Sequence, residues 1–420
     1  MKGTLSRARE ALRSRDFRFL LGARLVNTAG DGLFNAAIVG AAAFGENQDT
    51  AEGLARALVI TILPYSVLGP FTGVFIDRWS RRKILVRGPL LRALCVIPLI
   101  LLADSPDSWG FLLAALAAAG VNRFTSSTSS AVVPRVVPGE DLLMANSMAT
   151  VGATFTMAVF AFLGGMLADA FGEQPLFVWL IAIWCLAALL ARGIASDLQA
   201  PHAPAMRLHR DLARVAGEMA DGMRRLAHAP QALAPIATIA WDQLIQAVAF
   251  VLSIVVFREE FGQGVGAYSW VLAAGAVGLL LGIASVGALE NSMSRAGIVT
   301  LALVVSGVAP FAALFFITRP TVLAMGFLVG LAYAWKKVSV DTMVQEAVPD
   351  DFRGRAFAIY DVLFNIGRVI GTLLAVWLIP FAGTRGTLVA VGAGMLLWIP
   401  ILRAWLSRPT SQGVWQAPPQ

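Results

Sequence analysis

Two aspartates stand inside long apolar stretches of the chain, where an ionisable side chain is costly. Asp31 lies in "GDGLFNAA" and Asp242 lies in "WDQLIQAV". A charge in the middle of a membrane helix costs at least ~2.5–3.5 kcal/mol on insertion scales, so such residues are candidates for function. Burial disfavours the charged form of a carboxyl group and a nearby cation favours it, and a proton carrier needs both influences. We predict that Asp31, Asp242 or both carry a proton, with Arg368 as a counter-ion. The alternative is a permanent Asp–Arg pair that tethers helices.

A second cluster of charge directly follows another apolar stretch. Residues 73–83 read "GVFIDRWSRRK". A glycine without a side chain lets a neighbouring helix approach closely, and an acid at a helix end can accept hydrogen bonds from the positive N-terminus of another helix. The alternative is that the basic residues only orient the protein in the membrane. We predict a latch between helices, formed by Gly73, Asp77, Arg78, Arg81, Arg82 and Lys83.

The elements that carry these residues are long apolar segments. Of the 420 residues, 57% are hydrophobic and 14% are charged, whereas a soluble protein carries about a quarter charged residues. Apolar runs near twenty residues, the length that crosses a bilayer core, recur along the chain. The sequence therefore predicts an all-α membrane protein. Twelve transmembrane helices are expected near residues 17–44, 55–77, 83–103, 109–133, 142–169, 175–197, 232–257, 267–289, 296–318, 321–346, 355–383 and 385–406.

The formal charge of +7 is distributed unevenly between the connections. Most of the 33 lysines and arginines fall on the side of the N-terminal arm, and few fall on the other side: Arg56, Arg258, Arg319 and Arg385. Basic connections face the cytoplasm, so both termini are predicted to be cytoplasmic. This distribution explains the charge by membrane topology, and no nucleic-acid partner is expected.

The predicted spans divide into two sets of six. The longest connection contains "MRLHRDLARVAGEMADGMRRLAHAP", whose spacing of apolar residues predicts an amphipathic helix on the cytoplasmic membrane surface. It separates a six-helix bundle with an N-terminal arm (1–197) from a second bundle with a short tail (232–420), with residues 198–231 as the linker. Three short matches relate the halves, among them Asp31 with Asp242 at an offset of 211 residues. They predict a duplication, and such parallel repeats place a substrate site near the midplane.

These features resemble the Major Facilitator Superfamily over nearly the whole chain. Its signature reads roughly Gly-x-x-x-Asp-Arg-x-Gly-Arg-Arg/Lys between the second and third spans, and this chain departs from it at Ser80, where glycine is usual. The resemblance implies two pseudo-symmetric six-helix bundles that work by alternating access. It also implies that the latch closes on the start of the eleventh span, at Arg353 and Gly354, and favours the state closed to the cytoplasm.

Further polar and aromatic residues within the spans are candidates for a substrate cavity. Arg123 resembles the fourth-span arginine of the family's proton antiporters, without the glycine pattern around it. Arg24 and Arg92 are expected near the cytoplasmic end, with their charges reaching the membrane surface. Lys337 and Asp341, four residues apart, are expected to pair. For each aromatic residue, packing between helices is the alternative. The cavity candidates are Asn27, Phe34, Asn35, Arg123, Trp241, Gln243, Gln246, Tyr333, Trp335 and Asn365.

Within the superfamily the chain is similar to bacterial exporters of drugs, siderophores and metabolites. The similarity rests on "RSRDFRFLLGARLVNTAGDGLF", "PGEDLLMANS", "GMRRLAHAP" and "VPDDFRGRAFA". It implies a monomeric, proton-coupled exporter of a small amphipathic compound in the bacterial inner membrane, with no cofactor, metal or catalytic residue. No Gly-x-x-x-x-Gly-Lys-Ser/Thr loop is present in the sequence, so ATP is not expected as the direct energy source. The alternatives are a lipid or lysolipid translocase, a proton-coupled importer, and a non-transporting sensor or scaffold.

Overall fold

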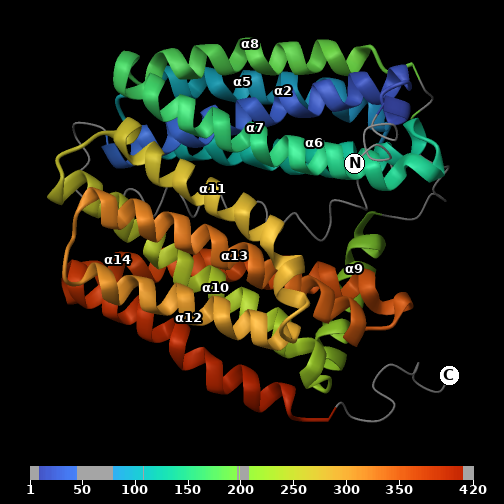
Figure 1. Ribbon diagram of the computed structural model, residues 1–420. Helices are drawn as coiled ribbons and strands as arrows, with labels where there is room; N and C mark the ends of the chain where they lie inside the picture. Colours follow the sequence, from blue (N-terminus) through green and yellow to red (C-terminus); the bar gives the residue numbers. More distant parts are fainter. Residues whose placement is uncertain (1–8, 45–78, 107, 196–197, 199–207, 410–420) are drawn as a thin grey trace. The chain divides into compact units, whose positions relative to one another are not determined.

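The computed structural model of the chain is built from long α-helices (Figure 1). It describes residues 9–44, 79–106, 108–195, 198 and 208–409. These residues form two compact units, here called unit 1 and unit 2. The division falls after Asp211, except that Gly264–Ser269 belong to unit 1. The predicted second span and three latch residues, Gly73, Asp77 and Arg78, lie outside the described residues.

Unit 1 contains the predicted first span and the third to sixth spans. Serine side chains begin two of these helices, since Ser14 and Ser108 accept hydrogen bonds from the free N–H groups of Phe17 and Phe111 at 3.2 and 3.3 Å. The elements are α2 (Arg15–Val39) with the π-helical turn η1 (Gly40–Phe44), α5 (Arg81–Leu101), α6 (Trp109–Val136), the 3-10 helix η3 (Gly139–Asp141), α7 (Leu142–Phe171) and α8 (Glu173–Arg192).

Unit 2 contains most of the linker helix and of the helices after it. The predicted eleventh and twelfth spans meet at Gly383, whose φ of +64° a glycine adopts without steric cost, so the chain turns there. The elements are α9 (Leu208–Ala227), α10 (Pro230–Val255) with the π-helical turn η4 (Val256–Glu260), α11 (Val265–Glu290), α12 (Arg295–Ala313), α13 (Arg319–Ala347) and α14 (Asp350–Leu406). The first residues of α9 (up to Asp211) and of α11 (up to Ser269) belong to unit 1.

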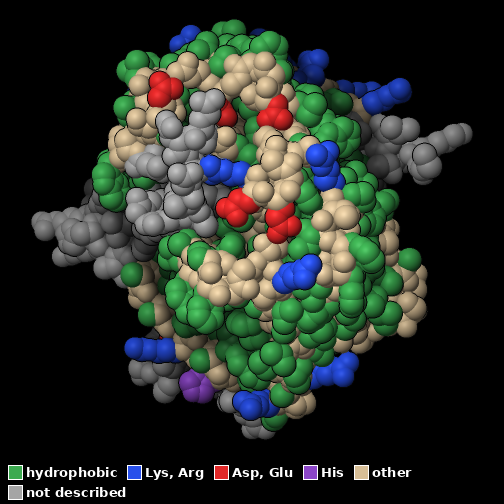
Figure 2. All heavy atoms as spheres, turned by 90° about the vertical axis from the view of Figure 1, so that its left-hand side faces the viewer, with side chains coloured by type: hydrophobic (Ala, Val, Ile, Leu, Met, Phe, Trp, Pro, Cys, Tyr) green, Lys and Arg blue, Asp and Glu red, His purple; other side chains and the backbone are tan. Residues whose placement is uncertain are grey.

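The helices have the length and composition of membrane spans. Among the described residues, eight are long and apolar enough to cross a membrane, with α14 counted once. α2 and α6 are not among them because they carry polar residues, such as Asp31 in α2 and the run "TSSTSS" in α6. Hydrophobic side chains cover much of the face shown in Figure 2, and Leu91, Leu94 and Leu101 of α5 are exposed. The predicted all-α membrane class is confirmed.

Glycines allow the helices that carry the two aspartates to pack closely against neighbouring helices. In unit 2, a Cβ added to Gly367 would lie 2.3 Å from the carbonyl oxygen of Ala240, so α14 packs directly against α10. In unit 1, a Cβ added to Gly32 would lie 2.6 Å from the carbonyl oxygen of Met157, so α2 packs directly against α7. Small residues allow such close helix contact, which is a main source of helix association in membranes.

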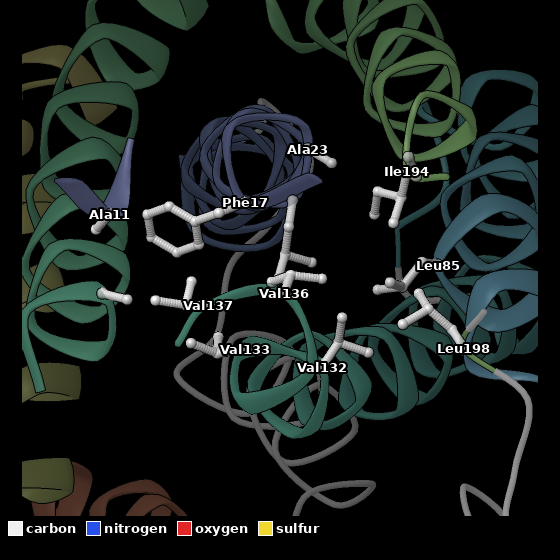
Figure 3. Packing of buried hydrophobic residues seen from close by; sticks show 13 residues of the cluster. Ala11, Phe17, Ala23, Leu85, Val132, Val133, Val136, Val137, Ile194 and Leu198 are labelled. Carbon is white, nitrogen blue, oxygen red and sulfur yellow. The ribbon is translucent and has the colours of Figure 1, made fainter. Parts of the chain in front are cut away.

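A hydrophobic cluster anchors the beginning of α2 in unit 1. Figure 3 shows Phe17 beside valines from the end of α6, and Phe17 is fully buried. The Ser14 hydroxyl donates a hydrogen bond to the carbonyl oxygen of Val136 at 2.6 Å. The Asp16 carboxylate accepts one from the backbone N–H of Ala195 at 2.8 Å. These contacts fix α2 at one end, and therefore the depth at which its later polar residues lie.

The linker forms the predicted helix, α9, but it does not leave all of its apolar side to the membrane. Leu226 is fully buried. A Cβ added to Gly222 would lie 2.8 Å from the Ile359 side chain at the start of α14. The guanidinium group of Arg225 lies 6.0 Å from the centre of the Phe352 ring. The second half of α9 thus packs on the start of α14 within unit 2, because that helix start offers it an apolar surface.

Candidate functional site

In unit 1, Asp31 forms an ion pair inside the helix bundle. Its carboxylate on α2 lies 2.6 Å from the guanidinium group of Arg92 on α5. The side chain of Arg92 is 1% exposed and that of Asp31 is 15% exposed. A charge that is removed from water requires a partner, and each of these two charges supplies it to the other.

The guanidinium group of Arg92 has three further neighbours. It donates hydrogen bonds to the amide oxygens of Asn27 at 3.0 Å and Asn122 at 3.1 Å, and Asn27 itself donates to Asn122 at 3.2 Å. The indole ring of Trp184 lies 3.8 Å from the guanidinium carbon, in a cation–π contact. Arg92 therefore joins helices α2, α5, α6 and α8 at one point.

In unit 2, Asp242 of α10 pairs with Lys336 of α13. Both side chains are fully buried. Lys336 also donates a hydrogen bond to the Ser306 hydroxyl on α12 at 2.8 Å. The second carboxylate oxygen of Asp242 accepts a hydrogen bond from Gln246 at 2.8 Å. Three helices of unit 2 thus meet at a lysine–aspartate pair without access to water.

The two pairs occupy related positions in the repeat, with one difference. Asp31 and Asp242 match at an offset of 211 residues (242 minus 31). The bases, however, are not at matching positions. Arg92 lies on α5, the third predicted span. Lys336 lies on α13, the tenth predicted span, which in the repeat corresponds to the fourth span and not to the third. At an offset of 214 residues, Arg92 matches Ser306, Asn122 matches Lys336, and Trp184 matches Trp398.

The two matching tryptophans make different contacts. Trp398 donates a hydrogen bond to the Thr238 hydroxyl at 2.9 Å and stacks on Trp241 with ring centres 5.0 Å apart. Trp241 in turn donates to the carbonyl oxygen of Gly394 at 2.9 Å. In unit 1 the position that matches Trp241 is Gly30 (241 minus 30 is also 211), and a Cβ there would lie 2.3 Å from the Trp184 indole nitrogen.

The bases differ from those expected from the sequence. Arg368 was predicted as the counter-ion, but it lies on an exposed part of α14. The ion pairs of the two aspartates are with Arg92 and Lys336 instead. Arg92 was expected to reach the membrane surface, and this is wrong, because its guanidinium group is buried against Asp31. The predicted Lys337–Asp341 pair is confirmed at 2.5 Å.

Several predicted cavity residues use their polar groups inside their own unit. Asn27 binds Arg92, and Gln246 binds Asp242. Trp335 donates to the Ser285 hydroxyl at 2.9 Å. Gln243 and Phe34 are buried, and the Phe34 ring lies 5.9 Å from Trp184. Asn365 donates to the carbonyl oxygen of Asp361 at 2.7 Å, whereas Asn35, Arg123 and Tyr333 are half-buried.

The described part of the predicted latch makes local contacts. The Arg82 side chain donates to the carbonyl oxygen of Arg192 at 3.1 Å, and the Arg81 backbone N–H donates to Leu198 at 3.2 Å. Lys83 is exposed. In unit 2, Arg353 pairs with Asp350 at 2.5 Å, and Gly354 has open space at its Cβ position. The latch itself remains a prediction.

Sequence reasoning missed the two bases and their supporting residues. Lys336 was passed over beside Lys337, and Arg92 was placed at the wrong depth. A signal was present in the sequence, because the pairs that match at an offset of 214 include the two bases and both tryptophans. The residues that were missed are Arg92, Asn122, Trp184, Ser306, Lys336 and Trp398.

Comparisons with known proteins agree with this architecture. The sequence model of the Major Facilitator Superfamily, a protein family, matches residues 20–240 and 236–419 of this chain. An uncharacterised MFS-type transporter from Mycobacterium tuberculosis is 30% identical over 400 residues, which cover 91% of this chain and 89% of that protein. The multidrug efflux pump Tap from Mycolicibacterium fortuitum is 26% identical over 346 residues, which cover 80% of this chain and 82% of that protein.

A solved structure shows the same fold. The bacterial homologue of the iron transporter ferroportin, in its inward-facing state, superposes with a TM-score of 0.74 and 17% identity. The match covers 94% of this chain and 99% of that chain. At this identity the likeness concerns the fold alone.

Proposed function

Because the chain belongs to the Major Facilitator Superfamily of membrane transporters, we propose that it exports a small amphipathic compound in exchange for protons. The observation that carries the proposal is the buried acid–base pair in each unit, Asp31 with Arg92 and Asp242 with Lys336. A desolvated acid beside a base can change its protonation when its surroundings change. Alternating access provides such a change, because it exposes a site first to one side of the membrane and then to the other.

A buried ion pair is not the least costly way to hold two helices together. Replacing a buried ion pair by well-packed hydrophobic residues is often neutral, or stabilising by ~1–4 kcal/mol. Leucines at these positions would therefore hold the helices together at less cost. Buried charges in membrane helices accordingly mark ion or substrate pathways by default, which favours a role in proton movement.

The direction and the class of cargo follow from similarity. The efflux pump Tap is similar over 80% of this chain, and export of amphipathic compounds is the interpretation that this relative favours. Both termini are proposed to be cytoplasmic, because most basic residues fall in the connections on the side of the N-terminal arm. A monomer in the bacterial inner membrane is part of the same proposal.

Transport of a fluorescent dye tests this proposal. The purified full-length protein is reconstituted into liposomes, and ethidium serves as the probe with an imposed pH gradient. We expect ethidium and protons to move in opposite directions, and transport to stop when an uncoupler removes the gradient. The double variant Asp31→Asn with Asp242→Asn should fall to the rate of empty liposomes. Movement of dye and protons in the same direction would favour an importer, and transport indifferent to the gradient would exclude proton coupling.

The latch is a separate part of the proposal. Asp77 would hold the N-terminus of the eleventh span, near Arg353 and Gly354, in the state closed to the cytoplasm. The variant Asp77→Asn should then slow dye transport severalfold while the amount of protein in the membrane stays the same. The matched control is Asp104→Asn, an exposed acid after α5. Equal transport rates in the two variants would contradict the latch.

A further inference from the structure

We propose that the two buried pairs have different tasks: Asp242–Lys336 in unit 2 holds the exchangeable proton, and Asp31–Arg92 in unit 1 is a permanent ion pair. This inference rests on the proposed proton coupling and names the site that performs it. It follows from the chemistry of the two bases and from the partners that each one has.

The first difference is the base itself. An arginine guanidinium group remains protonated under all conditions that proteins meet, whereas a lysine amine can release its proton. Arg92 can therefore only balance an ionised Asp31. Lys336 and Asp242 can share one proton, since transfer from the lysine nitrogen to the carboxylate oxygen breaks an N–H bond and forms an O–H bond. That transfer leaves the buried pair neutral.

The second difference is the set of neighbours. Arg92 is held by Asn27, Asn122 and the Trp184 ring, all of which suit a cation. Protonation of Asp31 would leave that buried cation without an anion, which is costly. The geometry around Arg92 therefore favours one fixed charge state.

The neighbours of the unit 2 pair suit more than one charge state. The Ser306 hydroxyl accepts from the charged amine of Lys336, and the same hydroxyl can donate to a neutral amine. The Gln246 amide donates to Asp242 and can do so whether or not the other oxygen is protonated. Uptake of a proton from water on Asp242, or release of one from Lys336 to water, thus strands no buried hydrogen-bonding group, and alternating access provides the contact with water that either step needs.

Other polar and charged groups lie around the Asp242–Lys336 pair on the same and neighbouring helices. Tyr333 of α13 interacts electrostatically with Asp242, with Asp341 on its own helix and with Arg368 of α14. α10 supplies Gln246, and α12 supplies Ser306. Lys336 is the base in direct contact with Asp242, so the exchange is assigned to these two residues.

A test that needs no cargo compares two neutralised pairs in the purified full-length protein. Asp242→Asn with Lys336→Gln removes the unit 2 pair, and Asp31→Asn with Arg92→Gln removes the unit 1 pair. Both double variants avoid a stranded charge. Thermal unfolding in detergent is followed from about pH 5 to pH 9, where free aspartate and lysine do not titrate. If the difference in unfolding temperature between a variant and the wild type changes with pH, the pair removed in that variant gains or loses a proton in the folded protein.

We expect the unfolding temperature of the unit 2 double variant, relative to the wild type, to change by about 2–4 °C or more over this range. For the unit 1 double variant the difference should stay constant. A constant difference for unit 2, or a pH-dependent one for unit 1, would overturn the inference. Because ethidium is absent, this result stands even if the proposed export of amphipathic compounds fails.

A second measurement uses neighbouring lysines as a matched pair in the liposome assay. Lys336→Arg keeps the buried positive charge but removes the ability to release its proton. We expect gradient-driven ethidium transport to slow about tenfold or more. Loss of a positioned proton-transfer group usually costs about a hundredfold or more, so tenfold is a lower limit. Exchange of ethidium for ethidium, without net proton movement, should persist. Lys337→Arg, one position along α13, should retain both activities. Unchanged gradient-driven transport in Lys336→Arg would contradict the assignment.

Discussion

In unit 1 the base beside the buried aspartate is Arg92 on α5, whereas in unit 2 it is Lys336 on α13. The acid has kept its place in the repeat, while the base has moved to the neighbouring helix of the bundle. The position that holds Arg92 in unit 1 is occupied by Ser306 in unit 2, and Ser306 still contacts the base. The repeat therefore preserves a place where charges meet, and the residue that supplies the cation is free to change.

The aromatic residues near the two ion pairs also differ between the units. Gly30 leaves room for Trp184 to lie over Arg92. In unit 2 the matching position is Trp241, which stacks on Trp398. Gly30 thus allows Trp184 to make a cation–π contact with Arg92. In unit 2, Trp241 fills the matching position, and Trp398 stacks on it instead. One pair is surrounded by groups that fix a cation, and the other by groups that do not.

The largest effect on stability should come from removing the acid of unit 2. Asp242→Ala leaves Lys336 fully buried with Ser306 as its remaining described partner, and breaking a buried pair in this way costs about 3–5 kcal/mol. Asp31→Ala leaves Arg92 with two asparagines and the Trp184 ring, and Asp31 was itself partly exposed. We expect a loss of about half that size in unit 1, measured by thermal unfolding in detergent.

The control for this comparison removes both charges of unit 2. Asp242→Ala with Lys336→Met should recover most of the stability lost in Asp242→Ala, because no buried charge remains unpaired. Equal losses for Asp242→Ala and Asp31→Ala would mean that the neighbours of Arg92 do not support its charge. The contrast between the units would then concern geometry alone.

How far the sequence predicts this site depends on what each signal measures. Apolar runs of bilayer length predicted the long helices that the described residues form, because length and hydropathy are local properties. The same runs made Asp31 and Asp242 conspicuous as ionisable residues. The partners could not be assigned in this way, because pairing depends on which side of a helix faces the bundle.

Lys336 and Lys337 illustrate that limit. Adjacent residues of an α-helix point about 100° apart, and depth along the helix does not distinguish them. Lys336 is fully buried, while the Lys337 side chain is 32% exposed. The i,i+4 rule found the local pair Lys337–Asp341. No local rule reaches from Asp242 to Lys336, since they are 94 residues apart.

A medium effect is expected at the glycine that makes room for the unit 1 tryptophan. The Cβ of Gly30→Ala would lie 2.3 Å from the Trp184 indole nitrogen, so the ring must leave its place over Arg92. Overpacking of this kind costs about 1–3 kcal/mol, which should appear in the unfolding temperature in detergent. The matched control is Gly139→Ala, where the added Cβ meets nothing within 4 Å. An unfolding temperature equal to that of the control would show that Trp184 can shift freely.

The smallest effect is expected at the unit 2 tryptophan. Trp398→Phe keeps an aromatic ring against Trp241 but loses the hydrogen bond to Thr238, which contributes about 0.5–1.5 kcal/mol. In unit 1 the indole nitrogen of Trp184 has no hydrogen-bond partner within the described structure, so Trp184→Phe should lose mainly cation–π attraction to Arg92. Both losses are measured as shifts in the unfolding temperature in detergent.

Repeating the two tryptophan substitutions in the neutralised pairs separates their causes. In the unit 1 double variant no cation lies under the ring, so Trp184→Phe should cost less there than in the wild type. In the unit 2 double variant Trp398→Phe should cost the same as in the wild type, because the hydrogen bond that it loses ends on Thr238 and not on the ion pair. If the cost of Trp398→Phe also falls when the unit 2 charges are removed, both tryptophans support the ion pairs, and the contrast between the two aromatic environments is wrong.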